Sequence, residues 1–235
     1  MSFRFKQFFI EDSKCAMKVG TDGVLLGAWV TIDRFTQSQK TASLKVERIL
    51  DVGTGSGLIA RMLMQRCPEA EVEGIDIDEA AVEQARENGV KAYCSSLQNW
   101  QGSYDLIVSN PPYFQNSLKN PDEGRKAARH TDTLSYAELV HHSAQLLTEH
   151  GQLALILPAE AENEIRQLAA AADLFLTHVT RVYSKENKKP KRVLLAFQLK
   201  IEDLRLKIEE DSLVLEDEKG GRSAAYSELC KEFYL

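Results

Sequence analysis

The stretch Leu50-Asp51-Val52-Gly53-Thr54-Gly55-Ser56-Gly57-Leu58 decides the fold of this chain. Residues 46–52 predict a β-strand that runs directly into the glycines, and residues 58–66 predict a helix that follows them. Glycine allows the backbone to turn sharply and lets a ligand approach without meeting a Cβ atom. A strand, a glycine-rich turn and a helix in this order predict the binding site of a nucleotide-like cofactor.

The spacing of the glycines narrows the class of cofactor site. It is G-x-G-x-G, whereas dinucleotide-binding enzymes carry G-x-G-x-x-G. No Lys-Ser or Lys-Thr pair follows the last glycine, which excludes the phosphate-binding loop of nucleoside triphosphatases. A glycine-rich turn is a weak indication by itself, so the assignment depends on the segments that follow it.

An acidic residue ends the next predicted strand, at residues 71–76. Asp76 lies about 20 residues beyond the glycine turn, where the ribose-binding acid of such sites belongs. A carboxylate in this place can accept hydrogen bonds from both ribose hydroxyls. Asp78 is predicted to cap the helix at residues 79–88, and Gly89 to end that helix.

The third and fourth strands are predicted at residues 90–94 and 104–109, and Leu97 between them is expected to pack against an adenine ring. The fourth strand runs into Asn110-Pro111-Pro112-Tyr113, where two prolines without N–H groups must end it. Asn110 and the Pro111 carbonyl offer acceptors, and Tyr113 offers a flat aromatic face. This set suits a planar substrate with an NH2 group, although an ordinary proline-rich turn would contain the same residues.

Strands and helices alternate through the rest of the chain. Ser135 and Glu138 form a capping box that begins a helix ending at residue 149. The other predicted elements are strands at 151–157, 174–183, 193–199 and 212–215, and helices at 158–172 and 226–235. The alternation predicts an α/β fold in which helices cover both faces of a parallel sheet.

The N-terminal residues predict smaller elements. Residues 3–10 suit a short strand paired with residues 17–19, and Thr21 or Asp22 is predicted to cap the helix that follows. With 235 residues the chain is expected to be one domain, 1–235. Its parts would be an N-terminal extension, a core and a C-terminal strand with a helix, at residues 1–45, 46–200 and 201–235.

Ligands of parallel sheets bind outside the carboxyl ends of the strands. The glycine turn, Asp76 and Asn110 each follow such an end, so we expect them to meet at one rim. Two basic segments are predicted to reach the same rim and contact phosphate groups of RNA, although a solvated loop would have the same composition. Their basic residues are Lys119, Arg125, Lys126 and Arg129 in the first segment, and Lys185, Lys188, Lys189, Lys191 and Arg192 in the second.

Composition and charge limit the functional classes. The net charge is −6, so any attraction to nucleic acid must come from a local basic patch. The four cysteines are scattered without a C-x-x-C pair, which argues against a zinc site or a disulfide framework. No signal peptide and no apolar run of membrane-spanning length is evident. We therefore expect a cytoplasmic protein with no metal and no membrane partner.

Taken together, D-x-G-x-G-x-G, the acid at the end of the second strand and N-P-P-Y resemble class I S-adenosylmethionine-dependent methyltransferases that act on amines. Three further segments make the resemblance narrower. They are residues 5–8 (FKQF), residues 17–29 (MKVGTDGVLLGAW) and residues 233–235 (FYL). With these segments, nearly the whole chain resembles the bacterial tRNA1(Val) adenine-N6 methyltransferase family.

The resemblance implies a Rossmann-like class I methyltransferase fold with a mostly parallel, seven-stranded sheet. It implies methyl transfer from S-adenosylmethionine, leaving S-adenosylhomocysteine, to N6 of a tRNA adenosine, the anticodon-loop adenosine at position 37 of tRNA1(Val). The residues with implied catalytic roles are Asn110, Pro111, Pro112 and Tyr113. Those with implied cofactor contacts are Lys18, Thr21, Asp51, Gly53, Thr54, Gly55, Gly57, Asp76, Ile77, Ser96, Leu97 and Asn110. The family usually carries an acid after the third strand, so Ser96 here is expected to bond the cofactor adenine in its place.

Other functions remain open. Protein-glutamine N5 methyltransferases use the same proline-rich turn on a planar amide, but they typically carry an N-terminal helical domain for which little chain precedes residue 46. Guanine-N2 methylation of rRNA is a second alternative. A Rossmann-like module that binds a nucleoside without chemistry is the non-enzymatic one, and Asn110 argues against it because binding alone does not need an acceptor pair beside the cofactor.

Overall fold

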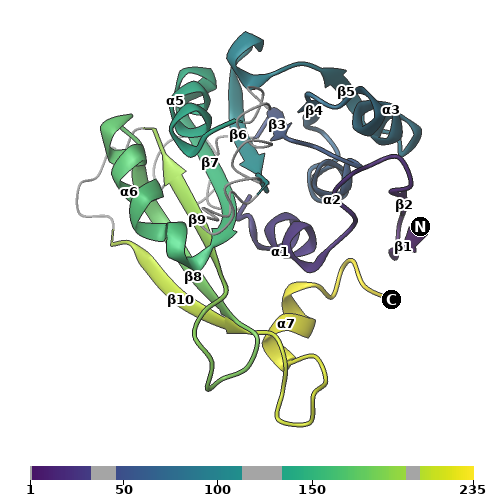
Figure 1. Cartoon of the computed structure of the whole chain (residues 1–235), viewed down its shortest axis with the longest axis vertical. Helices are drawn as coiled ribbons and strands as arrows, with labels where there is room; N and C mark the ends of the chain where they lie inside the picture. Colours follow the sequence, from purple (N-terminus) through teal and green to yellow (C-terminus); the bar gives the residue numbers. More distant parts are fainter. Residues whose placement is uncertain (1, 33–45, 113–133, 200–206) are drawn as a thin grey trace, which may run out of the picture.

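The computed structural model describes residues 2–32, 46–112, 134–199 and 207–235. Within them lie an eight-stranded sheet with helices on both faces and a separate hairpin of β1 (Ser2–Arg4) and β2 (Phe9–Glu11) (Figure 1). The strands of the large sheet, in spatial order, are β5 (Lys91–Cys94), β4 (Glu71–Asp76), β3 (Arg48–Val52), β6 (Tyr104–Ser109), β7 (Leu147–Pro158), β9 (Arg192–Gln198), β8 (Phe175–Tyr183) and β10 (Glu209–Val214).

Strand directions confirm the mostly parallel sheet. Among the described strands of this sheet only β9 runs against its neighbours, β7 and β8. The sheet has eight strands rather than the seven predicted, because β10, which overlaps the strand predicted at residues 212–215, joins the sheet edge parallel to β8. Its sequence, Glu-Glu-Asp-Ser-Leu-Val, is polar over most of its length, and the strand is held by backbone pairing at the sheet edge rather than by an apolar pattern.

Two hydrophobic clusters cover the two faces of the sheet. Alternate side chains of one strand point to opposite faces, so Ile49 joins the first cluster and Leu50 the second. The helices that pack on the first face are α1 (Thr21–Trp29), α2 (Leu58–Arg66), α3 (Glu79–Glu87) and α7 (Ala224–Leu229). Those on the second face are α5 (Tyr136–Leu146) and α6 (Glu162–Ala171), with the short 3₁₀ turns η2 (Leu97–Asn99) and η3 (Ala159–Ala161).

Several helix ends match the sequence signals. The Asp78 carboxylate accepts a hydrogen bond from Ala80 N at 3.0 Å and caps α3. Gly89 has a φ of 83°, the left-handed conformation predicted for the residue that ends this helix. The Ser135–Glu138 capping box forms with both of its reciprocal bonds. Local chemistry therefore fixed these boundaries.

Other boundaries were wrong. Residues 17–19 form no strand, because the partner of β1 is β2, the next segment of the same hairpin. The N-cap residue of α1 is Gly20, without a side-chain cap, and Asp22 binds Arg192 instead. Helix α5 ends three residues before residue 149, since β7 begins at Leu147, and α7 ends at Leu229.

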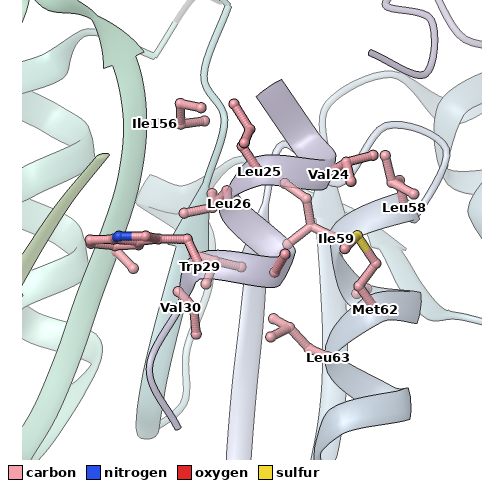
Figure 2. Packing of buried hydrophobic residues seen from close by; sticks show 14 of the residues in the cluster. Val24, Leu25, Leu26, Trp29, Val30, Leu58, Ile59, Met62, Leu63 and Ile156 are labelled. Carbon is pink, nitrogen blue, oxygen red and sulfur yellow. The ribbon is translucent and has the colours of Figure 1, made fainter. Parts of the chain in front are cut away.

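Helix α1 lies directly on α2, as Figure 2 shows. Every residue of α1 from Gly23 to Trp29 is buried, so this short helix has no solvent face beyond its first turn. Gly27 allows the close approach, because a Cβ atom at this position would lie 2.7 Å from the sulfur of Met62. The packing sets the first turn of α1 beside the glycine turn that precedes α2.

The two ends of the described chain pack together. Lys6 N donates to Phe233 O at 2.9 Å, and the rings of Phe5 and Tyr234 stack with centroids 6.1 Å apart. Phe5, Phe8 and Phe233 all belong to the same core cluster as α1 and α2. We propose on this basis that residues 1–235 fold as one domain.

Candidate active site

The glycine turn after β3 is a cradle with two different sides. Gly53, Gly55 and Gly57 all have positive φ, between 54° and 79°. A Cβ atom on Gly53 or Gly55 would meet no described heavy atom within 4 Å, whereas on Gly57 it would lie 2.7 Å from Val90. The first two glycines therefore leave open space for a ligand, and the third serves the packing of α2 against the β5 side of the core.

Asp51 holds the turn from beneath. Its side chain is fully buried, and one carboxylate oxygen accepts hydrogen bonds from Thr54 Oγ1 at 2.8 Å and Ala60 N at 3.2 Å. Burial raises the pKa of Asp51 to about 7, despite these two bonds, which lower it. Among the described residues no group donates to the other oxygen.

Asp76, at the end of β4, is oriented by the same turn. Its carboxylate accepts hydrogen bonds from Gly55 N at 2.9 Å and Asp78 N at 3.0 Å. Each carboxylate oxygen can accept more than one bond, so both can still accept from a ligand. The acid is thereby fixed at the carboxyl end of its strand, half-buried and next to exposed Ile77.

A cavity of about 690 Å³ joins these features to the proline-rich turn after β6, a volume usual for a small-molecule site. Nearly all residues with implied cofactor contacts line it: Lys18, Thr21, Gly53, Thr54, Gly55, Asp76, Ile77, Ser96, Leu97 and Asn110. Asp51 and Gly57 do not line it. The Asp51 side chain is buried in the core, and a Cβ atom on Gly57 would point at Val90. The predicted convergence on the carboxyl rim is thus present in the fold.

Asn110 and the two prolines border the cavity as well. Asn110 is half-buried, Pro111 is buried and Pro112 is exposed. Ser109 Oγ donates to Val52 O at 2.8 Å, which ties the end of β6 to the end of β3 and so to the glycine turn. Tyr113 lies outside the described residues.

The sequence interpretation identified only two residues, Lys18 and Thr21, of one wall of the cavity. Residues 15–20, part of which was assigned to a strand, line it together with the first turn of α1. Lys18 Nζ donates to Asp12 O at 2.7 Å, so this predicted cofactor residue also holds its own segment in place. The hydrophobic spacing of residues 15–20 carries no signal for such a role, and only the resemblance of residues 17–29 pointed to this region.

The second basic segment follows β8, which runs parallel to β7, so it leaves the sheet at the carboxyl rim. Lys188, Lys189 and Lys191 are exposed there, and Lys185 pairs with Glu216 at 3.3 Å. Arg192 differs from them, because its Nε donates to the Asp22 carboxylate at 2.8 Å. Lys119, Arg125, Lys126 and Arg129 lie outside the described residues.

One group of side chains has the composition of a metal site. His178, Glu209 and Asp211 hold their ligand atoms within 4.8 Å of one another across β8 and β10. His178 stacks on Trp29 and lies 3.1 Å from the Asp211 carboxylate, which fastens the edge strand to its neighbour. These residues are outside the cavity, and nothing further in the described structure indicates a ligand there.

Sheet topology, the glycine cradle and the N-P-P turn at one rim define a class I methyltransferase. Solved structures agree on the fold: a predicted O-methyltransferase from Agrobacterium tumefaciens has a TM-score of 0.66 at 16% identity, covering 90% of this chain and 96% of that one. A class I S-adenosylmethionine-dependent methyltransferase described as such from Listeria monocytogenes has a TM-score of 0.59 at 12% identity, covering 83% and 68%.

Sequence comparison identifies the family. The model of the methyltransferase small domain matches residues 32–171. Relatives named tRNA1(Val) (adenine(37)-N6)-methyltransferase are 42% identical in Parabacteroides distasonis and 40% identical in Phocaeicola vulgatus, each alignment covering 99% of this chain and 97% of the relative. The chain therefore belongs to the tRNA1(Val) (adenine(37)-N6)-methyltransferase family. Within the described residues, no helix combines the length and the apolar character that crossing a membrane requires.

Proposed function

We propose that this protein transfers a methyl group from S-adenosylmethionine to N6 of an adenosine in tRNA, and that the target is adenosine 37 of tRNA1(Val), as the names of its relatives state. One observation carries the proposal. Asn110 and Pro111 line the same cavity as the glycine turn and Asp76. An acceptor pair for an amine therefore lies beside a site for a nucleoside cofactor.

The residues present fit S-adenosylmethionine. The open side of Gly53 and Gly55 gives room for close backbone approach, and Asp76 offers a carboxylate for ribose hydroxyls. Ile77 and Leu97 provide apolar surface for the adenine ring, and Ser96 provides a hydroxyl at its edge. Lys18 and Thr21 would border the amino-acid end.

For this methyl transfer, the main task of the protein is to position the amine and the cofactor. S-adenosylmethionine supplies a methyl group on a sulfonium centre that is already a good leaving group. The N6 amine is a poor nucleophile, because its lone pair is delocalised into the ring. Acceptors at Asn110 Oδ1 and Pro111 O favour a more tetrahedral nitrogen and stabilise the positive charge that develops there. No side chain has to remove a proton before transfer.

The target base must leave its stack to enter the cavity, and an anticodon-loop nucleotide does so at low cost. Tyr113 would stack on the base and hold N6 in line with the methyl group. Lys188, Lys189 and Lys191, with the basic residues of the 119–129 segment, would contact tRNA phosphates at the rim. Arg192 is better assigned to the Asp22 pair than to RNA.

Methyl transfer into RNA tests the function directly. The protein is incubated with labelled S-adenosylmethionine and total RNA from a strain that lacks the gene, and the labelled nucleoside is identified. We expect N6-methyladenosine in one tRNA. Label in guanosine would favour the rRNA alternative. Absence of label from all RNA would favour the glutamine alternative.

The role of Asn110 is tested with Asn110→Ala, for which we expect a rate loss on the order of 10²–10³, the scale of removing one preorganised polar contact. Cofactor affinity should change little. Asn99→Ala, an exposed asparagine outside the cavity, is the matched control. A near-normal single-turnover rate in Asn110→Ala would contradict the proposed mechanism.

A further inference from the structure

The segment from Glu11 to Val19, called the strap below, is held firmly against α3. Glu11 and Asn88 exchange two hydrogen bonds, from Glu11 N at 3.0 Å and from Asn88 Nδ2 at 2.7 Å. Ser13 Oγ donates to Gln84 Oε1 at 3.1 Å, and the Lys14 ammonium pairs with Glu87 at 2.7 Å. The strap is therefore a fixed wall of the cavity.

Buried Asp12 fixes the second half of the strap. Its carboxylate accepts a hydrogen bond from Val19 N at 3.0 Å, and its carbonyl accepts one from Lys18 Nζ. Met17 lies just before these two anchored residues. Its backbone position is thus set from both sides, while its side chain remains 48% exposed at the cavity.

Met17 reaches the proline-rich turn. Its sulfur lies 3.9 Å from Asn110 Nδ2, within the range of an N–H···S hydrogen bond. A thioether sulfur accepts but cannot donate, so it favours the NH2 group of the carboxamide on its side over the carbonyl oxygen. The Asn110 oxygen is then turned away from Met17.

We infer that Met17 positions the methyl-accepting base: it sets the orientation of the Asn110 carboxamide and forms the apolar wall against which the base packs. An exposed, flexible thioether is suited to this contact, because sulfur interacts favourably with aromatic rings and methionine adapts to their shape. The inference rests on the proposed function of the same site.

The contact between Met17 and the base should affect the rate of methyl transfer rather than the affinity for tRNA. Most of the affinity of a protein for RNA comes from phosphate contacts, which Met17 does not make. A misplaced base leaves those contacts intact and lowers only the rate at which the methyl group is transferred.

Single-turnover methylation of tRNA at saturating cofactor tests the role of Met17. We expect Met17→Ala to lower the rate about tenfold, the upper scale of a sulfur–aromatic contact. Met17→Leu keeps the volume but removes the acceptor, so we expect a loss of about threefold. The apparent tRNA affinity, the cofactor affinity by calorimetry and the melting temperature should stay near those of the unmodified protein. Phe9→Ala, which removes an exposed apolar side chain from β2 outside the cavity, is the control.

Two results would overturn the inference while the proposed function stands. One is a Met17→Ala rate within twofold of the unmodified protein. The other is a loss of cofactor affinity that saturating cofactor fully compensates, which would assign Met17 to the cofactor. If the unmodified protein methylates no tRNA, the proposed function itself fails, and the role of Met17 fails with it.

Discussion

Asp51 is a carboxyl group that the fold keeps away from water, directly beneath the glycine turn. Its raised pKa, about 7 against an ordinary value of 3.8, means that the folded protein binds a proton that the unfolded chain has already released. Asp76 contributes to this shift, although burial is the larger cause. The residue therefore links the stability of the cofactor turn to pH.

The sign of this linkage gives a prediction. Between about pH 4 and pH 7 the folded state holds more protons at this site than the unfolded state, so the contribution of Asp51 to stability falls as pH rises. Urea unfolding across this range should show the free energy of unfolding of the native protein declining relative to that of Asp51→Asn. A difference between the two proteins that does not change with pH would show that Asp51 ionises normally.

The three glycines of the turn show how far sequence reasoning reaches at this scale. The spacing predicted a cofactor turn, and Gly53 and Gly55 do face the cavity. Gly57 looks the same in the sequence but faces Val90. The sequence cannot separate the two roles, because a glycine is needed whether a ligand or a neighbouring side chain occupies the space where its Cβ would lie. Met17 was missed for a related reason, since its role depends on Asn110, 93 residues away.

At the scale of elements, the close packing of helix α1 on α2 can be tested by substitution. Gly23 and Gly27 both face α2, one turn apart. A methyl group at Gly27 would meet the sulfur and Cβ of fully buried Met62, at 2.7 and 3.1 Å. One at Gly23 would come closest to the end of the Leu58 side chain, at 3.0 Å, with Ile59 next at 3.8 Å.

We expect Gly27→Ala to lower the free energy of unfolding by about 1–2 kcal/mol, because overpacking exceeds the helix-propensity gain of roughly 1 kcal/mol. Gly23→Ala, the matched variant, should cost less. Chemical denaturation of both variants measures the difference. Equal or greater stability in Gly27→Ala would mean that α1 shifts away from α2 without cost.

Elements with a local chemical signature could be predicted to the residue. Helix α2, strands β4 and β6 and the caps of α3 and α5 are examples. Strand β10 was predicted only in part, at residues 212–215, because its first residues are polar and pair with β8 through the backbone at a sheet edge. The cap of α1 was predicted wrongly because of a tertiary contact: the Asp22 carboxylate binds Arg192, which is distant in the sequence.

At the scale of the whole molecule, the lysines at the two ends of the sheet differ in their surroundings. The chain is acidic overall, yet exposed Lys188, Lys189 and Lys191 follow the carboxyl end of β8. Lys91 stands at the amino end of β5, on the opposite rim, where it pairs with Glu71 and Glu73. A tRNA that places a base in the cavity would meet the first group and not the second.

Replacing Lys188, Lys189 and Lys191 with Ala should weaken tRNA binding and flatten its salt dependence. Each phosphate contact contributes a slope of about −0.7 for single-stranded RNA, so the loss should approach that figure per contacting lysine. Binding measured over a series of salt concentrations gives both quantities. Lys91→Ala should leave the slope unchanged, and an unchanged slope in the triple variant would make the segment a solvated loop.

The contact between the two ends of the chain has a consequence for biosynthesis. Lys6 bonds to Lys231, 225 residues further on, and the hairpin that it belongs to leads straight into the strap. The ribosome makes this hairpin almost first and the residues that it packs against almost last. A nascent chain can thus fix the strap against α3 early, whereas the hairpin that precedes the strap reaches its final packing only when residues 231–234 have been made.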